Sequence, residues 1–437
     1  MSKIEGGVLK RLQGIDIDPL AVGISQLNIS LKCCKPYEKL PMLAENILEG
    51  DSLFSNYGKK VDVIVGNPAY MQWRYIPKTY RQRLLEENDF EYLAKGSMDY
   101  STFFFKSAHR RLKKNGILAF IATNKLLASA QTKDFRIWLS NSFDILKILD
   151  FRKKVFQGTD VETAIYILRK KSDGASHSKS YIDVAEFVRS EGHLEERLIT
   201  KVPINLIENT PYRVIPTKVT DKILNVYSWF EKNKNRFSSL DDQCNLKAGL
   251  RITDIDADDV LKKRPPKSVI SEYLPLLDGT CLEAGNSKIK QVTRWVSKDS
   301  RKLITWWKDI PAYSGYVILK ELSSRPAFVL SKKVPAILNS LGIIFPKENS
   351  NIDIKDVNTW FDHPFTEAMM EFWFGPNRHH ATQRWKNVYS GKLPIPKNGR
   401  IKGTFPSWVI KASLEFLEKE VSRSDLETKD SKLKKSS

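Results

Sequence analysis

The four residues from Asn67 to Tyr70, Asn-Pro-Ala-Tyr, directly follow the β-branched run Val61–Gly66. The side-chain oxygen of Asn67 and the backbone carbonyl of Pro68 can both accept hydrogen bonds from one planar amine. This favours a pyramidal nitrogen whose lone pair can attack a methyl donor, while Tyr70 stacks on the ring that carries the amine. Such a transfer depends mainly on positioning. A turn without chemistry is the alternative, because Asn-Pro is also a frequent turn signal.

Two carboxylates upstream could hold a nucleoside. Asp16 ends a short strand in GIDIDPLAV, and an acidic side chain at that place in a nucleotide-binding sheet can accept hydrogen bonds from two ribose hydroxyls. Ile17 beside it offers an apolar face to an adenine ring, and Asp51, in NILEGDSLF, could accept a hydrogen bond from the exocyclic amine of that adenine. Each carboxylate also has a purely structural interpretation: a turn with a helix cap for Asp16 and a solvated loop for Asp51.

A sheet is needed to position these residues, because Asp16 ends one short run of strand-forming residues and Asn67 follows another. The sequence predicts helices over residues 20–32 and 97–116, the second closed by basic residues and Gly116. It predicts strands over residues 12–19, 61–68, 117–122, 145–151 and 163–170. Strands that alternate with helices indicate a mostly parallel, doubly wound α/β sheet. Ligands of such sheets bind at the carboxyl ends of the strands.

The composition is that of a globular chain with excess positive charge. Its 437 residues are 41% hydrophobic, and 71 Lys and Arg against 51 Asp and Glu give a formal charge of +20, which favours polyanionic partners such as nucleic acid. The most apolar stretch, residues 116–130, is too short and too polar for a membrane span, and no secretory signal begins the chain. The four cysteines show neither metal-ligand nor disulfide spacing. We therefore expect a cytoplasmic protein without a metal site or a membrane partner.

The chain is expected to hold two domains. Residues 1–171 would form the sheet domain, and residues 172–180, small and polar, would be a linker. Residues 181–420 would form a second, mixed α+β domain, in which residues 293–308 and 378–397 interleave Arg and Lys with Trp and Tyr. Residues 421–437 form a charged tail that cannot bury enough apolar surface to fold alone.

Several motifs, in their order along the chain, resemble those of one enzyme family. GIDIDPLAV, EGDSLF and VDVIVGNPAY are similar to the cofactor and catalytic motifs of amino-group DNA methyltransferases, in particular adenine-N6 enzymes of restriction-modification systems of the TaqI and Eco57I types. The similarity continues through residues 99–127 and 148–168. GKLPIPK, at residues 391–397, resembles the end of the target-recognition domain of these enzymes. The resemblance covers residues 10–170 well and the rest in patches.

The resemblance implies a Rossmann-like fold that binds S-adenosylmethionine. Asp16 would bind the ribose of this cofactor, Ile17 would pack on its adenine, and Asp51 would read the adenine amine. Asn67, from the catalytic loop, would also lie at the cofactor.

The resemblance also implies that a target adenine leaves the DNA duplex to reach the catalytic loop. Asn67, Pro68 and Tyr70 would form this loop, and Phe156 would stack on the opposite face of the flipped base. Residues 181–420 would be a target-recognition domain for double-stranded DNA. The candidates for DNA contact are Arg294, Arg378, Arg384 and Lys386, each of which could equally be a solvated surface charge.

Two departures from the family pattern stand out. Ala69 replaces the second proline of the usual Asn-Pro-Pro-aromatic loop and leaves every hydrogen-bond acceptor in place. The glycine-rich cofactor loop of the family should precede GIDIDP, with the first strand and helix of the sheet, and the chain contains none of these. We therefore expect an N-terminally truncated sheet or a second polypeptide that supplies the glycine-rich loop.

Three functions remain open from the sequence. The leading interpretation is a site-specific DNA adenine-N6 methyltransferase of a restriction-modification system, with a restriction endonuclease as a companion. One alternative is an inactive or split DNA-binding remnant that needs a partner chain. The other is an RNA or protein amino-group methyltransferase, since Asn-Pro-Pro-Tyr loops also occur in such enzymes.

Overall fold

The computed structural model describes residues 11–33, 42–55, 60–86, 99–151, 161–172, 180–190, 193–283, 288–311, 315–323, 328–375, 383–384, 387–401 and 403–418. The chain divides into two compact units. Unit 1 comprises residues 1–123, 138–146 and 165–178, and unit 2 comprises residues 124–137, 147–164 and 179–437. Each unit is described by itself.

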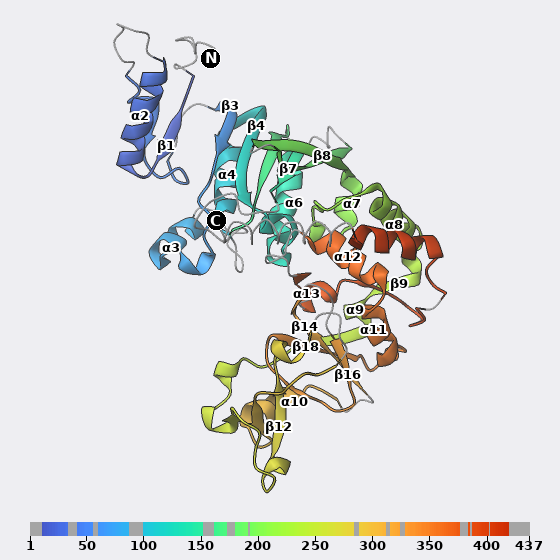
Figure 1. The fold of residues 1–437 in the computed structure, drawn as a ribbon. Coiled ribbons are helices and arrows are strands. Elements are labelled where there is room, and N and C mark those ends of the chain that lie inside the picture. Colours follow the sequence, from blue (N-terminus) through green and yellow to red (C-terminus); the bar gives the residue numbers. More distant parts are fainter. Residues whose placement is uncertain are drawn as a thin grey trace. The chain divides into compact units, whose positions relative to one another are not determined.

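A six-stranded mixed sheet is the central element of the first half of the chain (Figure 1). Its strand order is β3-β4-β6-β5-β7-β8, with β3 paired parallel to β4, β5 parallel to β7, and β7 antiparallel to β8. The strands are β3 (Val61–Gly66), β4 (Leu112–Thr123), β5 (Phe143–Asp150), β6 (Thr163–Lys170), β7 (Tyr181–Ser190) and β8 (His193–Pro203). The predicted strands over residues 61–68, 117–122, 145–151 and 163–170 are confirmed in this sheet, whereas the strand predicted over residues 12–19 lies outside it. Strands β7 and β8, beyond residue 171, add to the same sheet.

The predicted helix over residues 97–116 is too long. Helix α4 spans Ser101–Arg111, and the chain enters β4 at Leu112. The reason is pairing with β3: Val61 pairs with Leu112 and Val63 with Ile117, so the residues between bulge out of the ladder. Gly116 permits this bulge, because a Cβ atom there would lie 3.0 Å from the carbonyl oxygen of Asp62.

A separate parallel pair of strands holds the first part of the chain. Strand β1 (Gly14–Asp16) pairs with β2 (Ile47–Glu49), and helix α2 (Pro19–Cys33) lies beside them (Figure 1). The predicted first strand and helix are thus confirmed. Val22, Leu43 and Ile47 form their small core. The remaining elements of unit 1 are the short 3-10 helix η1 (Trp73–Tyr75) and helix α3 (Lys78–Glu86), and helix α6 (Lys133–Ser142) belongs to unit 1 only from Trp138 onward.

Unit 2 contains helices and small sheets. Its helices are α5 (Lys125–Ala128), α7 (Ile204–Asn209), α8 (Asp221–Lys232), α9 (Leu240–Gln243), α10 (Arg301–Trp307), α11 (Ile354–Phe361), α12 (Pro364–Phe374) and α13 (Asn387–Ser390), with a further helical segment over residues 407–418. One four-stranded sheet has the order β10-β18-β14-β16, with β10 (Cys244–Ala248), β18 (Leu341–Pro346), β14 (Tyr316–Lys320) and β16 (Phe328–Ser331). A second has the order β11-β13-β12-β17, with β11 (Val260–Leu261), β13 (Trp295–Ser297), β12 (Tyr273–Leu277) and β17 (Ala336–Ile337). Two smaller pairs are β9 (Phe237–Ser239) with β20 (Pro394–Pro396) and β15 (Leu322–Ser323) with β19 (Gln383–Arg384).

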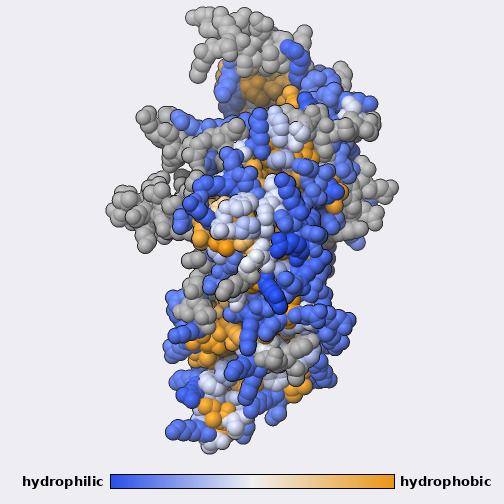
Figure 2. Space-filling model, turned by 90° about the vertical axis from the view of Figure 1, so that its right-hand side faces the viewer, coloured by the Kyte–Doolittle hydropathy of each residue, from blue (hydrophilic) through white to orange (hydrophobic). Residues whose placement is uncertain are grey.

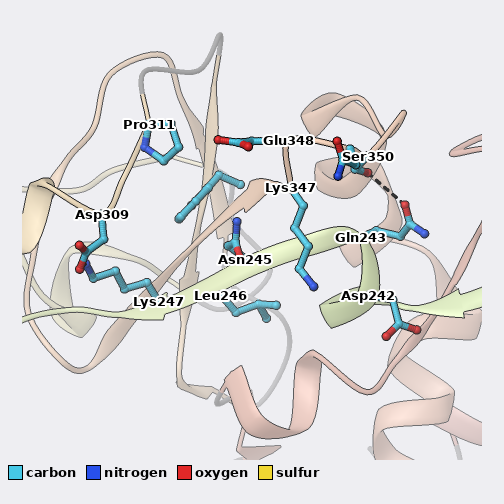
Figure 3. A pocket seen from close by; sticks show the side chains of 12 residues that line it. Asp242, Gln243, Asn245, Leu246, Lys247, Asp309, Pro311, Lys347, Glu348 and Ser350 are labelled. Atoms are coloured by element: carbon cyan, nitrogen blue, oxygen red, sulfur yellow. Dashed lines mark hydrogen bonds and ion pairs between the residues drawn. The ribbon is translucent and has the colours of Figure 1, made fainter.

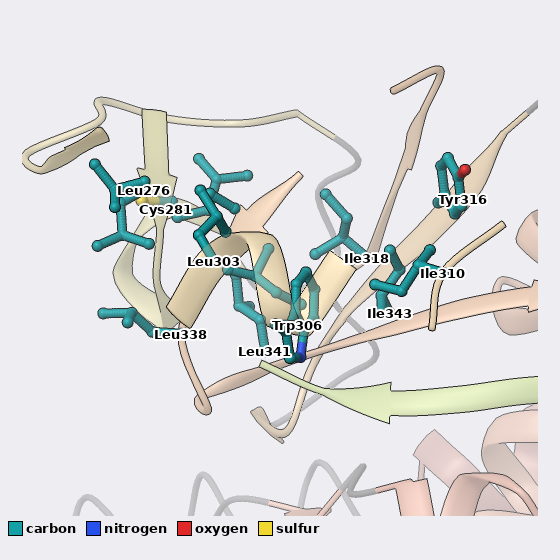
Figure 4. Packing of buried hydrophobic residues seen from close by; sticks show 14 of the residues in the cluster. Leu276, Cys281, Leu303, Trp306, Ile310, Tyr316, Ile318, Leu338, Leu341 and Ile343 are labelled. Carbon is teal, nitrogen blue, oxygen red and sulfur yellow. The ribbon is translucent and has the colours of Figure 1, made fainter. Parts of the chain in front are cut away.

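The two four-stranded sheets share one apolar core. Leu276 of β12, Trp306 of α10 and Ile343 of β18 pack in one buried cluster (Figure 4). Trp306 also donates its indole N–H to the carbonyl of Ala248, at 3.0 Å, so its polar edge is satisfied. These two sheets therefore have a hydrophobic core of their own.

A buried arginine ties together two distant segments of unit 2. Arg136 is 1% exposed and donates to the carbonyl oxygens of Leu126, Ser129 and Tyr212, at 2.7–2.8 Å. Tyr212 has a positive φ of 57°, which costs backbone energy, and the guanidinium bonds help to hold that turn.

None of the helices within the described ranges is long and apolar enough to cross a membrane. In the same part of the chain, no group of His, Cys, Asp and Glu side chains could hold a metal ion, and Cys33, Cys244 and Cys281 are free thiols.

Candidate active site

The parallel pairing of β1 and β2 brings Asp16 and Asp51 to one sheet edge. Asp16 pairs with Glu49, and the Gly50 N–H donates to the Asp16 carbonyl at 2.8 Å. The two strands therefore end side by side, with Asp16 as the last residue of β1 and Asp51 just after β2. The Asp16 carboxylate is exposed and accepts the Asp18 N–H at 2.9 Å, while Ile17 is 68% exposed. An exposed carboxylate next to an exposed apolar side chain fits a ribose and the base attached to it.

Asp51 is half-buried and held by two hydrogen bonds. The Leu53 N–H donates to its Oδ1 at 2.9 Å, and the Tyr80 hydroxyl donates to its Oδ2 at 2.7 Å. A carboxylate has about four acceptor positions, so Asp51 keeps capacity for an adenine amine. The Tyr80 hydroxyl also bonds the Tyr100 hydroxyl at 2.7 Å. Burial, together with the neighbouring groups, raises the pKa of Tyr80 far above its usual value, and burial also raises the pKa of Tyr100.

The loop Asn67–Tyr70 leaves the carboxyl end of β3. Pro68 is buried and anchors it, Asn67 and Ala69 are exposed, and Tyr70 is half-buried. Burial raises the pKa of the Tyr70 hydroxyl, and a hydrogen bond from the Asn67 side chain opposes this shift. Because the amide donates through its nitrogen, its oxygen is the group left to accept from a substrate amine.

The residues after this loop are fixed to the start of α4. The Tyr100 N–H donates to the Met71 carbonyl at 2.8 Å, and Gln72 forms a β-bridge with Asp99. Trp73 stacks on Phe103 with ring centres 5.7 Å apart. These contacts give the loop Asn67–Tyr70 a rigid support on its C-terminal side, which catalysis by positioning would require.

The predicted target-base and DNA residues are described only in part. Phe156, Arg378 and Lys386 lie outside the described residues. Arg384 pairs with Leu322 through the backbone of β19. Arg294 is 41% exposed, and its guanidinium lies 3.2 Å from Asp278; burial alone would raise the pKa of Asp278, but hydrogen bonds from Thr280 and the charge of Arg294 hold it below its usual value.

The sequence analysis missed Tyr80 and Tyr100. Tyr80 lies on α3, outside every motif, and Tyr100 lies in the segment over residues 97–116 that the sequence predicts only as a helix. No spacing in the sequence relates them to Asp51, which is 29 positions from Tyr80. Only the tertiary structure brings these three groups together.

Unit 2 contains a cleft of about 830 Å³ between β10 and the residues that follow β18 (Figure 3). Its walls carry mixed charge: Lys247 and Lys347 lie on it with Asp242, Asp309 and Glu348. Lys247 is already paired with Asp309, at 3.0 Å. None of the predicted site residues lines this cleft, so it is distinct from the candidate active site.

One protein family matches the first part of the chain. Residues 10–156 match the family model of the Eco57I restriction-modification methylase. The type II methyltransferase M.BanIII of Aneurinibacillus aneurinilyticus is 25% identical over 259 residues, 52% of this chain and 43% of that protein. M.HincII of Haemophilus influenzae is 26% identical over 117 residues, 26% of this chain and 23% of that protein. The chain thus spans less than half the length of the curated relatives it matches.

Among solved structures, the type IIL restriction-modification enzyme MmeI, determined in complex with DNA, has a similar fold. The TM-score is 0.58 at 14% identity, and the match covers 94% of this chain and 63% of MmeI.

The matched proteins are methyltransferases and enzymes of restriction-modification systems. Residues 10–156 are an Eco57I restriction-modification methylase domain. The cofactor expected for such a domain is S-adenosylmethionine. The residues present fit its adenosine half, because Asp16 and Ile17 are exposed at the end of β1 and Asp51 retains free acceptor positions.

Proposed function

We propose that this chain methylates N6 of a flipped-out adenine in a specific DNA sequence, as part of a restriction-modification system. The observation that carries the proposal is the loop after β3. Asn67 is exposed there and donates to Tyr70, while Pro68 is buried and Met71 is bonded to Tyr100. Two acceptors and one aromatic ring on a supported loop suit an aryl amine.

In this proposal S-adenosylmethionine supplies an electrophilic methyl group, and the residues of the chain orient the amine. The Asn67 oxygen and the Pro68 carbonyl accept the two amine hydrogens, so the nitrogen lone pair points away from the ring plane. Tyr70 stacks on one face of the base and Phe156 on the other. No general base is needed before transfer, because the cationic amine product loses its proton readily.

Residues 181–420 would hold and read the DNA. The formal charge of +20 supports an anionic partner. Arg294, Arg378, Arg384 and Lys386 remain our candidates for contact. In restriction-modification systems the companion activity is an endonuclease, which we place on another polypeptide or another segment.

We also propose that a polypeptide segment outside these 437 residues completes the cofactor site with a strand and a glycine-rich turn. Two apolar surfaces of unit 1 support this. Val63 and Val65, on one face of the edge strand β3, are 57% and 74% exposed, although parallel strands are normally covered on both faces.

The second surface lies on α2. Leu20, Ile24, Leu27 and Leu31 recur at helical spacing and are each more than half exposed. Figure 2 shows hydrophobic surface near the top of the view, at the height where Figure 1 draws α2 and β1. A strand beside β3 and a helix against α2 would cover both surfaces.

The test of the catalytic proposal is the Asn67→Ala variant. We expect methyl transfer to fall at least about a hundredfold, because one preorganised acceptor is lost, while DNA affinity stays within about twofold, because the amide does not contact phosphates. Digestion of the product DNA to nucleosides should yield N6-methyladenine.

Asn235→Ala, at an exposed position of the short helix Lys234–Arg236, is the matched control and should retain activity. Equal loss of methyl transfer and of DNA binding in Asn67→Ala would contradict the assigned role. N4-methylcytosine in the digest would contradict the choice of adenine.

A further inference from the structure

Tyr80 lies outside all the motifs that define the site, yet it is the central member of a short chain of hydrogen bonds. Its hydroxyl lies 2.7 Å from Oδ2 of Asp51 and 2.7 Å from the hydroxyl of Tyr100. The three residues come from the turn after β2, from α3 and from the start of α4.

The number of available protons fixes the direction of these two hydrogen bonds. The Asp51 carboxylate only accepts hydrogen bonds, so the single hydroxyl proton of Tyr80 points to it. The Tyr100 hydroxyl must then donate to the Tyr80 oxygen. Both phenols keep their protons at neutral pH, since a tyrosine hydroxyl ordinarily has a pKa of about 10 and burial raises the pKa of both further.

Tyr100, at the end of this series of hydrogen bonds, is connected to the proposed catalytic loop. Tyr100 donates its backbone N–H to the Met71 carbonyl at 2.8 Å, one residue after the Asn67–Tyr70 segment. Tyr80 therefore lies between Asp51, the candidate acceptor of a hydrogen bond from the cofactor adenine, and the loop that would receive the target base.

We propose that Tyr80 is a positioning residue of the cofactor site: its hydroxyl fixes the Asp51 carboxylate in the orientation that accepts the adenine amine, and Tyr100 ties this arrangement to the catalytic loop. This inference rests on the proposed function. A carboxylate held at Oδ1 by Leu53 and at Oδ2 by Tyr80 has little freedom to rotate, so its remaining lone pairs face a fixed direction.

The Tyr80→Phe variant isolates the hydroxyl. Phe54 packs edge-on against the Tyr80 ring at 5.5 Å, and the Arg83 guanidinium lies 3.7 Å above the Phe54 ring. A phenylalanine at position 80 keeps these ring contacts, so the variant should fold. Hydrogen bonds to a charged group contribute more to stability than neutral ones, so loss of this hydroxyl should be measurable.

We expect Tyr80→Phe to raise the KM and the calorimetric Kd for S-adenosylmethionine about tenfold or more, with kcat at saturating cofactor within about twofold of wild type. Tyr100→Phe removes only the outer donor and should raise KM less. In the double variant the effects should be non-additive, because Tyr100 acts through Tyr80. An unchanged KM, or a loss confined to kcat and melting temperature, would overturn the proposal.

Hydrogen exchange separates this proposal from the proposed function. The Leu53 amide is bonded to Asp51 Oδ1, so its exchange rate reports on the carboxylate without any cofactor. Faster exchange at Leu53 in Tyr80→Phe is the expected result, and an unchanged rate would show that Tyr80 does not fix Asp51. The wild-type chain could also fail to bind the cofactor and to methylate DNA while Tyr80→Phe still speeds exchange at Leu53. That result would refute the proposed function and the cofactor role of Tyr80, and would leave the Tyr80–Asp51 contact established.

Discussion

Tyr70 illustrates how one side chain can combine two tasks. Its ring can stack on a base, and its hydroxyl accepts a hydrogen bond from the Asn67 amide. A tyrosine hydroxyl, with a pKa of about 10, is protonated at neutral pH, and burial raises the pKa of Tyr70 further, so this hydroxyl is unsuited to act as a general base.

For Tyr70 we predict that the ring matters more than the hydroxyl. Tyr70→Ala should reduce single-turnover methylation of DNA roughly tenfold or more, since base–aromatic stacking contributes about 1–3 kcal/mol. Tyr70→Phe should cost only about threefold, the amount expected from one neutral hydrogen bond. Tyr75→Ala, at a nearby tyrosine that is 63% exposed, serves as the control. Equal losses for Phe and Ala at position 70 would argue against stacking.

At the scale of secondary-structure elements, helix α12 has an unusual cap. His363 precedes the helix, and its Nδ1 accepts the Phe365 N–H at 3.3 Å. The imidazole also lies against the Phe405 ring, with centres 4.6 Å apart. Burial lowers the pKa of His363 to about 4. A protonated Nδ1 could not accept this bond, and a positive charge is unfavourable at a helix N-terminus.

This cap predicts a stability loss in mild acid. The unfolded histidine titrates near pH 6.5 and the folded one near pH 4, so between these values the unfolded state binds more protons. The free energy of unfolding therefore falls as the pH drops from about 6.5 towards 4. Urea denaturation at pH 7.5 and pH 5 measures this fall. His363→Asn keeps a good cap without the titration, and should lose less stability; the same loss in both proteins would exclude His363 as a source.

At the scale of the whole molecule, the exposed apolar surfaces of β3 and α2 predict that an added segment strengthens cofactor binding. We expect a fusion that places a family-consensus strand, glycine-rich turn and helix ahead of residue 11 to bind S-adenosylmethionine at least about tenfold more tightly than this chain, because it would contact the methionine moiety. Calorimetric titration compares the two proteins.

Val65→Lys in the same fusion should remove the gain, because a charged side chain would replace an apolar contact on the β3 edge. Asp62→Asn is a suitable control, since its side chain is 79% exposed and the exposed ion pair with Lys113 that it removes contributes little to stability. Tight binding by the unfused chain, unchanged by the fusion, would refute the need for such a segment.

The sequence by itself determined the order of the motifs and the strands that carry them. GIDIDP and VDVIVGNPAY each combine a short strand with the polar residue at its end, and local periodicity is enough to read such units. It therefore placed Asp16 and Asn67 at predicted strand ends, whereas only the structure shows strand β2, which precedes Asp51, and its pairing with β1.

Only the tertiary structure decided the contacts between distant residues. The end of α4 at Arg111 depends on the pairing of Leu112 with Val61, and the extension of the sheet depends on β7 lying beside β5. The position of Tyr80 on Asp51 depends on α3 packing near the turn after β2. Local propensity and periodicity carry no information about such long-range pairings, because their free energy exists only once the chain has brought the partners together.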